Sequence, residues 1–173
     1  GTDYRCPDGL IGLEQRIRAL APVADEYGVM LDFHSGDDLS AATRRVIQRA
    51  TQGRLHFKVS PMLQILVAEV LSQYDPPRFA RWWDDAVAYA RREAEAGSRL
   101  AVDCLREWAE AVDPAPSVHH SLFHHYGFRY VGQRDAQGQF LHREEFYDLA
   151  PEFFDACQAR IADYLCTLAE ELF

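Results

Sequence analysis

The stretch from residue 29 to residue 60 constrains the fold most, because it combines two strand patterns with a helix pattern between them. "VMLDFHSG" and "LHFKVS" alternate apolar and polar residues, as strands do. The intervening "SAATRRVIQRATQG" has helical periodicity, begins with residues that cap helices and ends at Gly53. A helical crossover between two strands favours parallel pairing. This stretch therefore predicts an α/β fold.

The rest of the chain is predicted to be mostly helical. "GLEQRIRALAPVADEYG" has four apolar residues at helical spacing on one face, namely Leu13, Ile17, Leu20 and Ala24. Pro61 suits the first turn of a helix through "MLQILVAEVLSQY". Further elements are expected as helices in "RFARWWDDAVAYARREAEAG", in "SRLAVDCLREWAEAV" and from Glu144 to the end, a third strand in "VHHSLFHHYGFRYV" and a turn in "RDAQGQF".

The number of strands limits the architecture. About three parallel strands are predicted in 173 residues, whereas a complete (β/α)8 barrel usually needs ~250 residues. The chain is therefore expected to form either the closing part of a TIM-type barrel or a small open sheet. Residues 1–173 are long enough for a single domain with its own core. The first residue, Gly1, suggests a truncated or processed chain.

Composition argues against several classes of protein. The formal net charge of −9 leaves no basic surface for nucleic acid or anionic membranes. No apolar run reaches the length of a membrane span, and no signal segment begins the chain. The four cysteines form no CxxC pair, so neither a zinc–thiolate site nor a disulfide framework is expected. These features predict a cytoplasmic protein that binds neither nucleic acid nor a membrane.

The two strand patterns carry polar residues that are expected to share one face. Side chains alternate between the faces of a strand, so Asp32 lies with His34, and His56 lies with Lys58. In a parallel sheet covered by helices, such residues are costly unless they are paired or bind a ligand. We therefore predict a site at the carboxyl ends of these strands, where α/β folds collect ligands. The alternative is a partly open antiparallel sheet whose polar face is solvated.

Two residue types on that face indicate chemistry. Lys58 is the only lysine in the chain, and the other seventeen basic residues are arginine. Either this is chance at a solvated position, or the site needs an amine, which releases a proton where a guanidinium does not. Six of the seven histidines lie in or beside the predicted strands. Imidazole and carboxylate groups are the usual ligands of zinc, manganese, nickel or iron(II).

The segment "SGDD", residues 35–38, follows the first predicted strand. Its side chains are suited to cap the next helix. Alternatively, its backbone N–H groups bind an anionic substrate, as helix N-termini do.

These motifs together resemble the tagaturonate epimerase family, which are metal-dependent hexuronate epimerases with a TIM-barrel fold. "LDFHSGDD", a short helix and "RLHFKVS" resemble the family's His-Ser-Gly-Ser-Asp-Lys motif, helix and His-Leu-Lys-Thr motif. "GTDY" resembles an upstream Gly-Val-Asp-Tyr, and "FHHYGFRYVG" resembles a late Leu-Leu-His-Val-Gly-Phe-Lys segment. The order agrees over roughly residues 1 to 131. Leu39 and Val59 depart from the motifs, in the places of the lysine and the threonine.

The resemblance implies the C-terminal half of such a barrel, with a divalent metal ion as cofactor. The metal ligands that it implies are His34, His56, His125 and Asp3. Asp32 is an alternative carboxylate ligand, and another histidine of residues 119–125 is an alternative imidazole ligand. The implied catalytic residues are Lys58 and Asp38. The implied contacts to the substrate are Ser35, Gly36 and Ser60.

Three functions are consistent with this reading. The leading prediction is a metal-dependent sugar-acid epimerase that interconverts ketohexuronates of the tagaturonate–fructuronate type. The ion would polarise substrate oxygens, and Lys58 would donate a proton or stabilise oxyanion charge. The alternatives are a metal-dependent hydrolase on a barrel scaffold and a non-catalytic half-barrel that binds a sugar acid. A half-barrel has open sheet edges, so self-association or pairing with a missing N-terminal half is expected.

Overall fold

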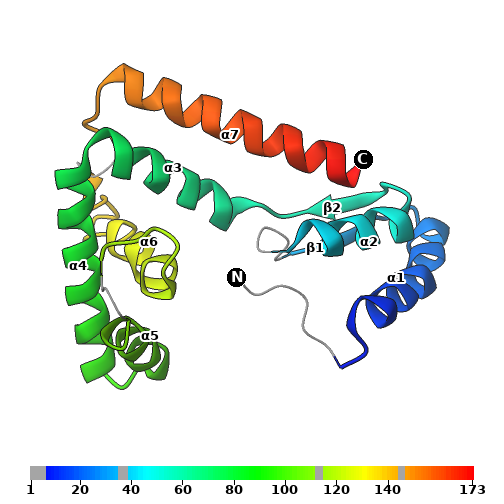
Figure 1. The fold of residues 1–173 in the computed structure, drawn as a ribbon, viewed down its shortest axis with the longest axis horizontal. Coiled ribbons are helices and arrows are strands. Elements are labelled where there is room, and N and C mark those ends of the chain that lie inside the picture. Colours follow the sequence, from blue (N-terminus) through cyan, green and yellow to red (C-terminus); the bar gives the residue numbers. More distant parts are fainter. Residues whose placement is uncertain (1–6, 35–38, 112–114, 144–146) are drawn as a thin grey trace. The chain divides into compact units, whose positions relative to one another are not determined.

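The computed structural model describes residues 7–34, 39–111, 115–143 and 147–173 (Figure 1). The chain divides into two compact units, one of residues 1–63 with 161–173 and the other of residues 64–160. This division into units does not test whether the chain is a single domain, which stays a prediction. The elements in chain order are α1 (Gly9–Glu26), β1 (Leu31–Phe33), α2 (Ala41–Thr51), β2 (Leu55–Phe57), α3 (Ser60–Tyr74), α4 (Pro76–Glu95), α5 (Arg99–Ala109), η1 (Phe123–Gly127), α6 (Phe128–Val131) and α7 (Pro151–Leu172).

The first unit contains the predicted strand–helix–strand arrangement. β1 and β2 pair in parallel, with Asp32 opposite His56. The helix α2 between them begins after Ser40, whose hydroxyl accepts a hydrogen bond from the Thr43 backbone amide at 3.2 Å. It ends at Gln52, in the left-handed conformation, and Gly53 follows at a φ of 75°. The parallel pairing confirms the α/β prediction, and the antiparallel alternative is wrong.

The core of this unit lies between the sheet and its helices. One buried cluster takes residues from α1, α2, β2 and α7, namely Ile17, Ile47, Ala50, Leu55, Leu168 and Leu172. An ion pair between Arg44 and Glu171 joins α2 to the last turn of α7. The predicted face of α1 is used in part, because Ile17 and Ala24 are buried whereas Leu20 is 54% exposed.

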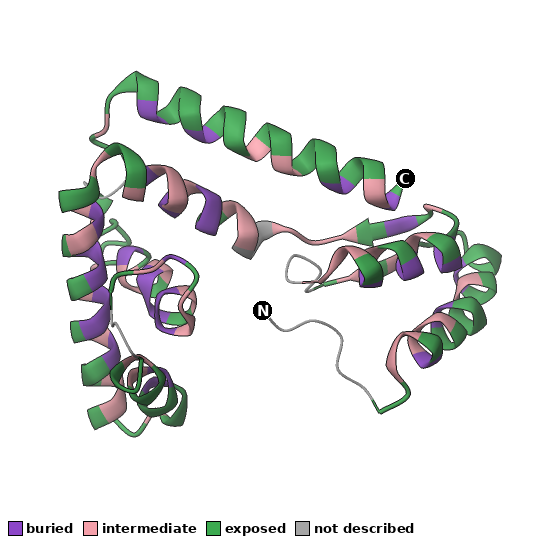
Figure 2. Ribbon diagram, in the orientation of Figure 1, coloured by how far each residue is buried: buried purple, intermediate pink, exposed green. Residues whose placement is uncertain are grey.

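The second unit has a core built around α4. This helix buries one face along its length, seen as a purple stripe in Figure 2. Trp82 lies edge-on to Phe123 of η1, with 4.7 Å between ring centroids. Trp83 stacks on the same phenyl ring at 6.0 Å. Apolar burial of large aromatic rings therefore holds α4 and η1 together.

The third predicted strand is helical instead. The segment from Ser121 to Val131 forms η1, a single π-helical turn, and then α6. Two of its buried residues, Leu122 and Phe123, lie four and three positions before the buried Tyr126, which is helical spacing. The described residues therefore form one sheet of two strands rather than about three.

Two further boundaries were tested by the structure. The turn in "RDAQGQF" is confirmed, because Arg134 and Phe140 form an antiparallel bridge around it. Gly138 supplies the positive φ of 80° that this turn requires. The last helix begins at Pro151 rather than at Glu144. Proline suits the first turn of a helix, where its missing N–H is not needed.

None of the described helices combines the length and the apolar character that crossing a membrane requires.

Candidate functional site

The polar residues of the two strands lie on one face of the sheet. Asp32 and His56 are opposite each other in parallel register. Because alternate residues of a strand share a face, His34 and Lys58 extend the same face toward the carboxyl ends of the strands. On the other face, Leu55 belongs to the buried core cluster. The predicted convergence of these four polar residues is thus confirmed by the pairing.

Lys58 and His34 form the direct contact within this group. The backbone N–H of Lys58 donates to the Phe33 carbonyl at 3.1 Å, which continues the ladder one residue beyond β2. The Lys58 Nζ atom then lies 3.3 Å from His34 Nε2. A lysine ammonium has only donors. When Lys58 is protonated, His34 therefore accepts at Nε2 and carries its own proton on Nδ1.

The polar face is open to solvent, as the alternative interpretation expected, although the sheet is parallel. Asp32, His34 and His56 are exposed, and Lys58 is half-buried. The prediction of a covered inner face is wrong for this chain, because its described helices pack on the apolar side of the sheet. Solvated charges need no ligand to offset a burial cost. The case for a site therefore rests on the Lys58–His34 contact and on the registered Asp32–His56 pair.

The donor types on this face suit a divalent metal ion. His34 and His56 offer imidazole nitrogens from neighbouring strands, and Asp32 offers a carboxylate, a set used by zinc, manganese, nickel and iron(II). Within the part of the chain that the structure describes, no three His, Cys, Asp or Glu side chains gather into a group that could hold a metal. In addition, Lys58 contacts the Nε2 atom through which His34 could bind an ion.

The other predicted site residues have different outcomes. Asp3, Ser35, Gly36 and Asp38 lie outside the described residues. Ser60 does not continue the strand alternation, because β2 ends at Phe57 and Ser60 is the first residue of α3. The helix begins there because Pro61 suits its first turn, and the contact of Ser60 to the substrate stays a prediction. His125 lies in η1 of the second unit and is exposed, so its place in a shared ligand set stays a prediction.

Shifted pKa values belong to residues away from this face. Burial raises the pKa of the Cys104 thiol and that of the Cys157 thiol. A hydrogen bond from Arg18 is the main cause that lowers the pKa of the partly exposed Glu14 carboxyl. Cys104 and Cys157 are therefore neutral, buried thiols at neutral pH, which pack as small apolar residues, whereas Cys166 of α7 is exposed.

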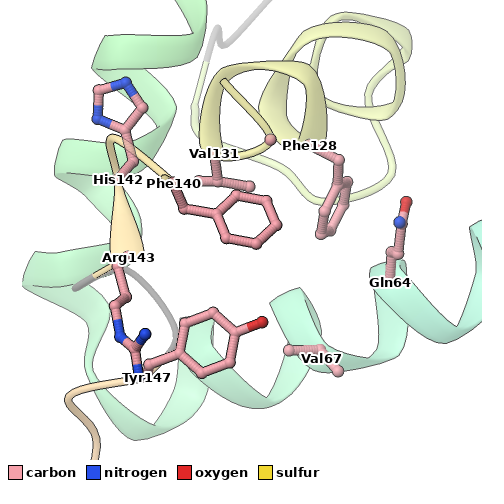
Figure 3. Close-up of a pocket in the computed structure, with 9 residues that line it drawn as sticks. Gln64, Val67, Phe128, Val131, Phe140, His142, Arg143 and Tyr147 are labelled. Atoms are coloured by element: carbon pink, nitrogen blue, oxygen red, sulfur yellow. The ribbon is translucent and has the colours of Figure 1, made fainter. Parts of the chain in front are cut away.

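A second concave site was missed by the sequence analysis. It lies in the second unit and is lined by residues of α3, of α6 and of the segment that follows the turn at Gly138 (Figure 3). Phe128 was noted only within a motif, and Phe140 only within a turn. No local pattern links these residues, because they come together through long-range packing.

A parallel strand–helix–strand unit with polar residues at its carboxyl end is a building block of α/β proteins whose sites lie at that end. Solved structures of one enzyme share the fold of this chain. The native crystal structure of fructuronate-tagaturonate epimerase UxaE from Cohnella laeviribosi aligns at a TM-score of 0.54 and 23% identity, covering 94% of this chain and 33% of that chain. The form complexed with two glycerols aligns at a TM-score of 0.54 and 22% identity, covering 94% of this chain and 33% of that chain.

The form of that enzyme complexed with one glycerol aligns at a TM-score of 0.50 and 22% identity, over 91% of this chain and 32% of that chain. The chain thus spans about a third of the length of this enzyme. At such identity the likeness concerns the fold, and at that level the predicted resemblance to a tagaturonate epimerase is confirmed. No family model and no curated protein matches the chain.

Proposed function

We propose that this chain carries part of the active site of a sugar-acid epimerase that acts on ketohexuronates of the tagaturonate–fructuronate type. The observation that carries the proposal is the 3.3 Å contact between Lys58 Nζ and His34 Nε2 at the carboxyl end of the β1–β2 pair. The fold shared with fructuronate-tagaturonate epimerase UxaE over 94% of the chain supports the same class of reaction. It supports an epimerase over a hydrolase on the same scaffold.

Lys58 and Asp38 would supply complementary proton chemistry. In a ketohexuronate of this type, the inverted carbon lies beta to the ketone, so its hydrogen is not directly acidic. Inversion then proceeds by retro-aldol cleavage and re-addition to the other face of the aldehyde. The carboxylate of Asp38 would take the proton of the hydroxyl on the inverted carbon. The Lys58 ammonium would stabilise the enediolate oxygen formed on cleavage.

A divalent ion would add Lewis-acid polarisation of the substrate oxygens. The residues proposed to hold it are His34 and His56, with His125 and with Asp3 or Asp32 as further ligands. His34 would turn its Nε2 atom from Lys58 to such an ion, which would leave the Lys58 amine for the substrate.

We also propose that the chain is part of a TIM-type (β/α) barrel. The parallel β1–α2–β2 unit is the repeating element of that architecture. The likeness to about a third of an epimerase chain supports the same view. The other strands of the barrel would then come from chain segments beyond these 173 residues.

Turnover of tagaturonate tests the proposal. The purified chain would be incubated with tagaturonate and manganese, nickel or zinc, and fructuronate would be followed by chromatography and NMR. We expect Lys58→Arg to lower the rate by about 100-fold or more, because the guanidinium is bulkier and holds its proton. Its circular dichroism melt should equal that of the parent. Arg91→Gln, at an exposed position on α4, is the matched control.

The outcomes of this experiment are distinct. Full activity of Lys58→Arg would show that the proposed role of Lys58 is wrong. A product of different mass from the substrate would favour a hydrolase. The parent could bind tagaturonate in calorimetry without converting it, and Lys58→Met could abolish that binding. This result would favour a sugar-acid-binding module. The exposed polar face and the short span of the chain are consistent with such a module. If the parent neither binds nor converts tagaturonate, the epimerase proposal and the binding-module alternative are both contradicted.

A further inference from the structure

A cavity of about 310 Å³ lies in the second unit, and none of the residues of β1 or β2 lines it (Figure 3). Its volume is within the range of small-molecule sites, roughly 300–1,000 Å³. Three aromatic rings, those of Phe128, Phe140 and Tyr147, form most of its wall. Val67 of α3 and Val131 of α6 complete the apolar lining. The cavity is therefore shaped for a flat apolar body.

Arg134 contacts the Phe140 ring, which forms one wall of the cavity. The Arg134 guanidinium carbon lies 3.8 Å from the centroid of the Phe140 ring, and an Arg134 nitrogen donates to the Gly138 carbonyl at 2.7 Å. Next in the chain, His142 stacks on Tyr130 at 3.8 Å between ring centroids. The Arg134 contacts support the Phe140 ring, which is 39% exposed, before any ligand binds, and this lowers the ordering cost of binding.

The wall on the side of Phe128 is held by α4. The Trp82 ring lies edge-on to Phe128, with 5.1 Å between centroids. The Trp82 indole N–H donates to the Gly127 carbonyl at 3.0 Å, at the last residue of the π-helical turn. Such turns occur frequently at functional sites. Both apolar walls of the cavity are thus set by interactions within the second unit.

The polar groups of the cavity favour an anion. Of the nine described residues that line it, none is acidic, although the chain as a whole has a net charge of −9. Arg143 supplies a guanidinium beside Tyr147, 5.0 Å from the centroid of that ring. The Gln64 amide and the Tyr147 hydroxyl add neutral hydrogen-bonding groups (Figure 3). A carboxylate is the anion that an arginine fork matches.

A ketohexuronate does not suit this cavity. It carries hydroxyl groups along its carbon chain, and each buried hydroxyl without a partner costs free energy. The neutral hydrogen-bonding groups of the lining are those of Gln64, His142 and Tyr147, too few to pair with all of these hydroxyl groups among the aromatic and valine side chains. The ligand of this cavity therefore differs from the proposed substrate.

We propose that this cavity is a second binding site, which takes a small aromatic monocarboxylate. The ring of the ligand lies among Phe128, Phe140 and Tyr147, and its carboxylate binds the guanidinium of Arg143.

Phenylacetate and phenylacetamide test the proposal as a matched pair, because they differ in charge and hardly in shape. Binding of each to the full chain would be measured by calorimetry and by ligand-observed NMR. We expect phenylacetate to bind about tenfold tighter than the amide, because its carboxylate forms a charge-assisted hydrogen bond with Arg143 that the neutral amide cannot form. In Arg143→Gln the two compounds should bind equally. Arg129→Gln, at an exposed position of α6 outside the cavity, should keep the difference.

A cavity-filling variant tests the location. Val67→Phe should abolish binding of both compounds while the melting curve stays close to that of the parent. The proposal is overturned if the parent binds neither compound, if the amide binds as well as the acid, or if Arg143→Gln leaves their ratio unchanged. Displacement of phenylacetate by tagaturonate would also overturn it, because the two ligands would then share one site.

Discussion

At Gly127 the π-helical turn passes directly over an aromatic ring. A Cβ atom built on Gly127 would lie 2.8, 2.9 and 3.0 Å from three carbons of the Phe123 ring. That ring is fully buried and packs against Trp82 and Trp83, so it has little room to move. The φ of Gly127 is −56°, which any residue adopts. Glycine is therefore required here by the close approach rather than by the backbone conformation.

We predict that Gly127→Ala destabilises the protein. Alanine favours a helix by about 1 kcal/mol over glycine, but crowding in a packed core costs about 1–3 kcal/mol. The net effect should be a loss of up to about 2 kcal/mol in the free energy of unfolding. Urea unfolding followed by tryptophan fluorescence measures it, because all three tryptophans lie in the second unit.

Phe123→Leu supplies the control for that prediction. The smaller side chain removes the ring that the new methyl group would meet, so alanine at Gly127 should cost less in this background. An equal cost in both backgrounds would show that crowding against Phe123 is not the cause.

Among the elements, α2 sets the spacing between the two strands of the candidate site. Its cap is Ser40, whose hydroxyl lies 3.2 Å from the Thr43 amide nitrogen and 3.1 Å from the Thr43 hydroxyl. We predict that Ser40→Ala lowers the free energy of unfolding by about 1 kcal/mol. Ser40→Asp should retain most of the stability, because its carboxylate also caps a helix. Thermal unfolding by circular dichroism measures both, and equal melts for alanine and parent would contradict the role of the cap.

The elements also show how far the sequence could predict the fold. Parallel pairing of β1 and β2 followed from period-two alternation and the helix between them, both of which are local signals. The third strand was mispredicted in "VHHSLFHHYGFRYV", where the four- and three-residue spacing of Leu122 and Phe123 from Tyr126 indicates a helix.

The candidate site was predicted in part for the same reason. Alternation placed Asp32, His34, His56 and Lys58 on one face, and the structure pairs Asp32 with His56 in register and brings Lys58 against His34. It did not indicate that the face would be exposed, since exposure depends on which elements cover the sheet. The aromatic cavity had no sequence signal at all, because Val67, Phe128 and Phe140 are far apart in the chain and meet only through packing.

At the scale of the whole molecule, the small sheet favours association. In the described residues β1 and β2 pair only with each other, so each strand has one edge without a partner strand. An apolar groove of about 280 Å³ runs beside β2 and is lined in part by Leu165 and Phe173, both exposed. We predict that the chain self-associates through this region as its concentration rises, since open edges and exposed apolar surface promote pairing.

Light scattering across a range of concentrations measures this association. Leu165→Glu should shift the chain toward the monomer, because it places a charge in the groove. Val102→Glu, at an exposed apolar position of α5, is the matched control and should leave association unchanged. A strictly monomeric parent at every concentration would contradict the prediction.

The solitary lysine has a practical consequence. Apart from the terminal amine, Lys58 is the only primary amine in the chain, and its nitrogen lies 3.3 Å from the His34 ring. An amine-selective acylating reagent therefore has a single side-chain target, placed within the candidate site itself. The mass added at Lys58 over time becomes a direct readout of whether the amine is engaged, shielded or released. Occupancy of the site can thus be followed by mass spectrometry in the unaltered protein, with no reporter group introduced.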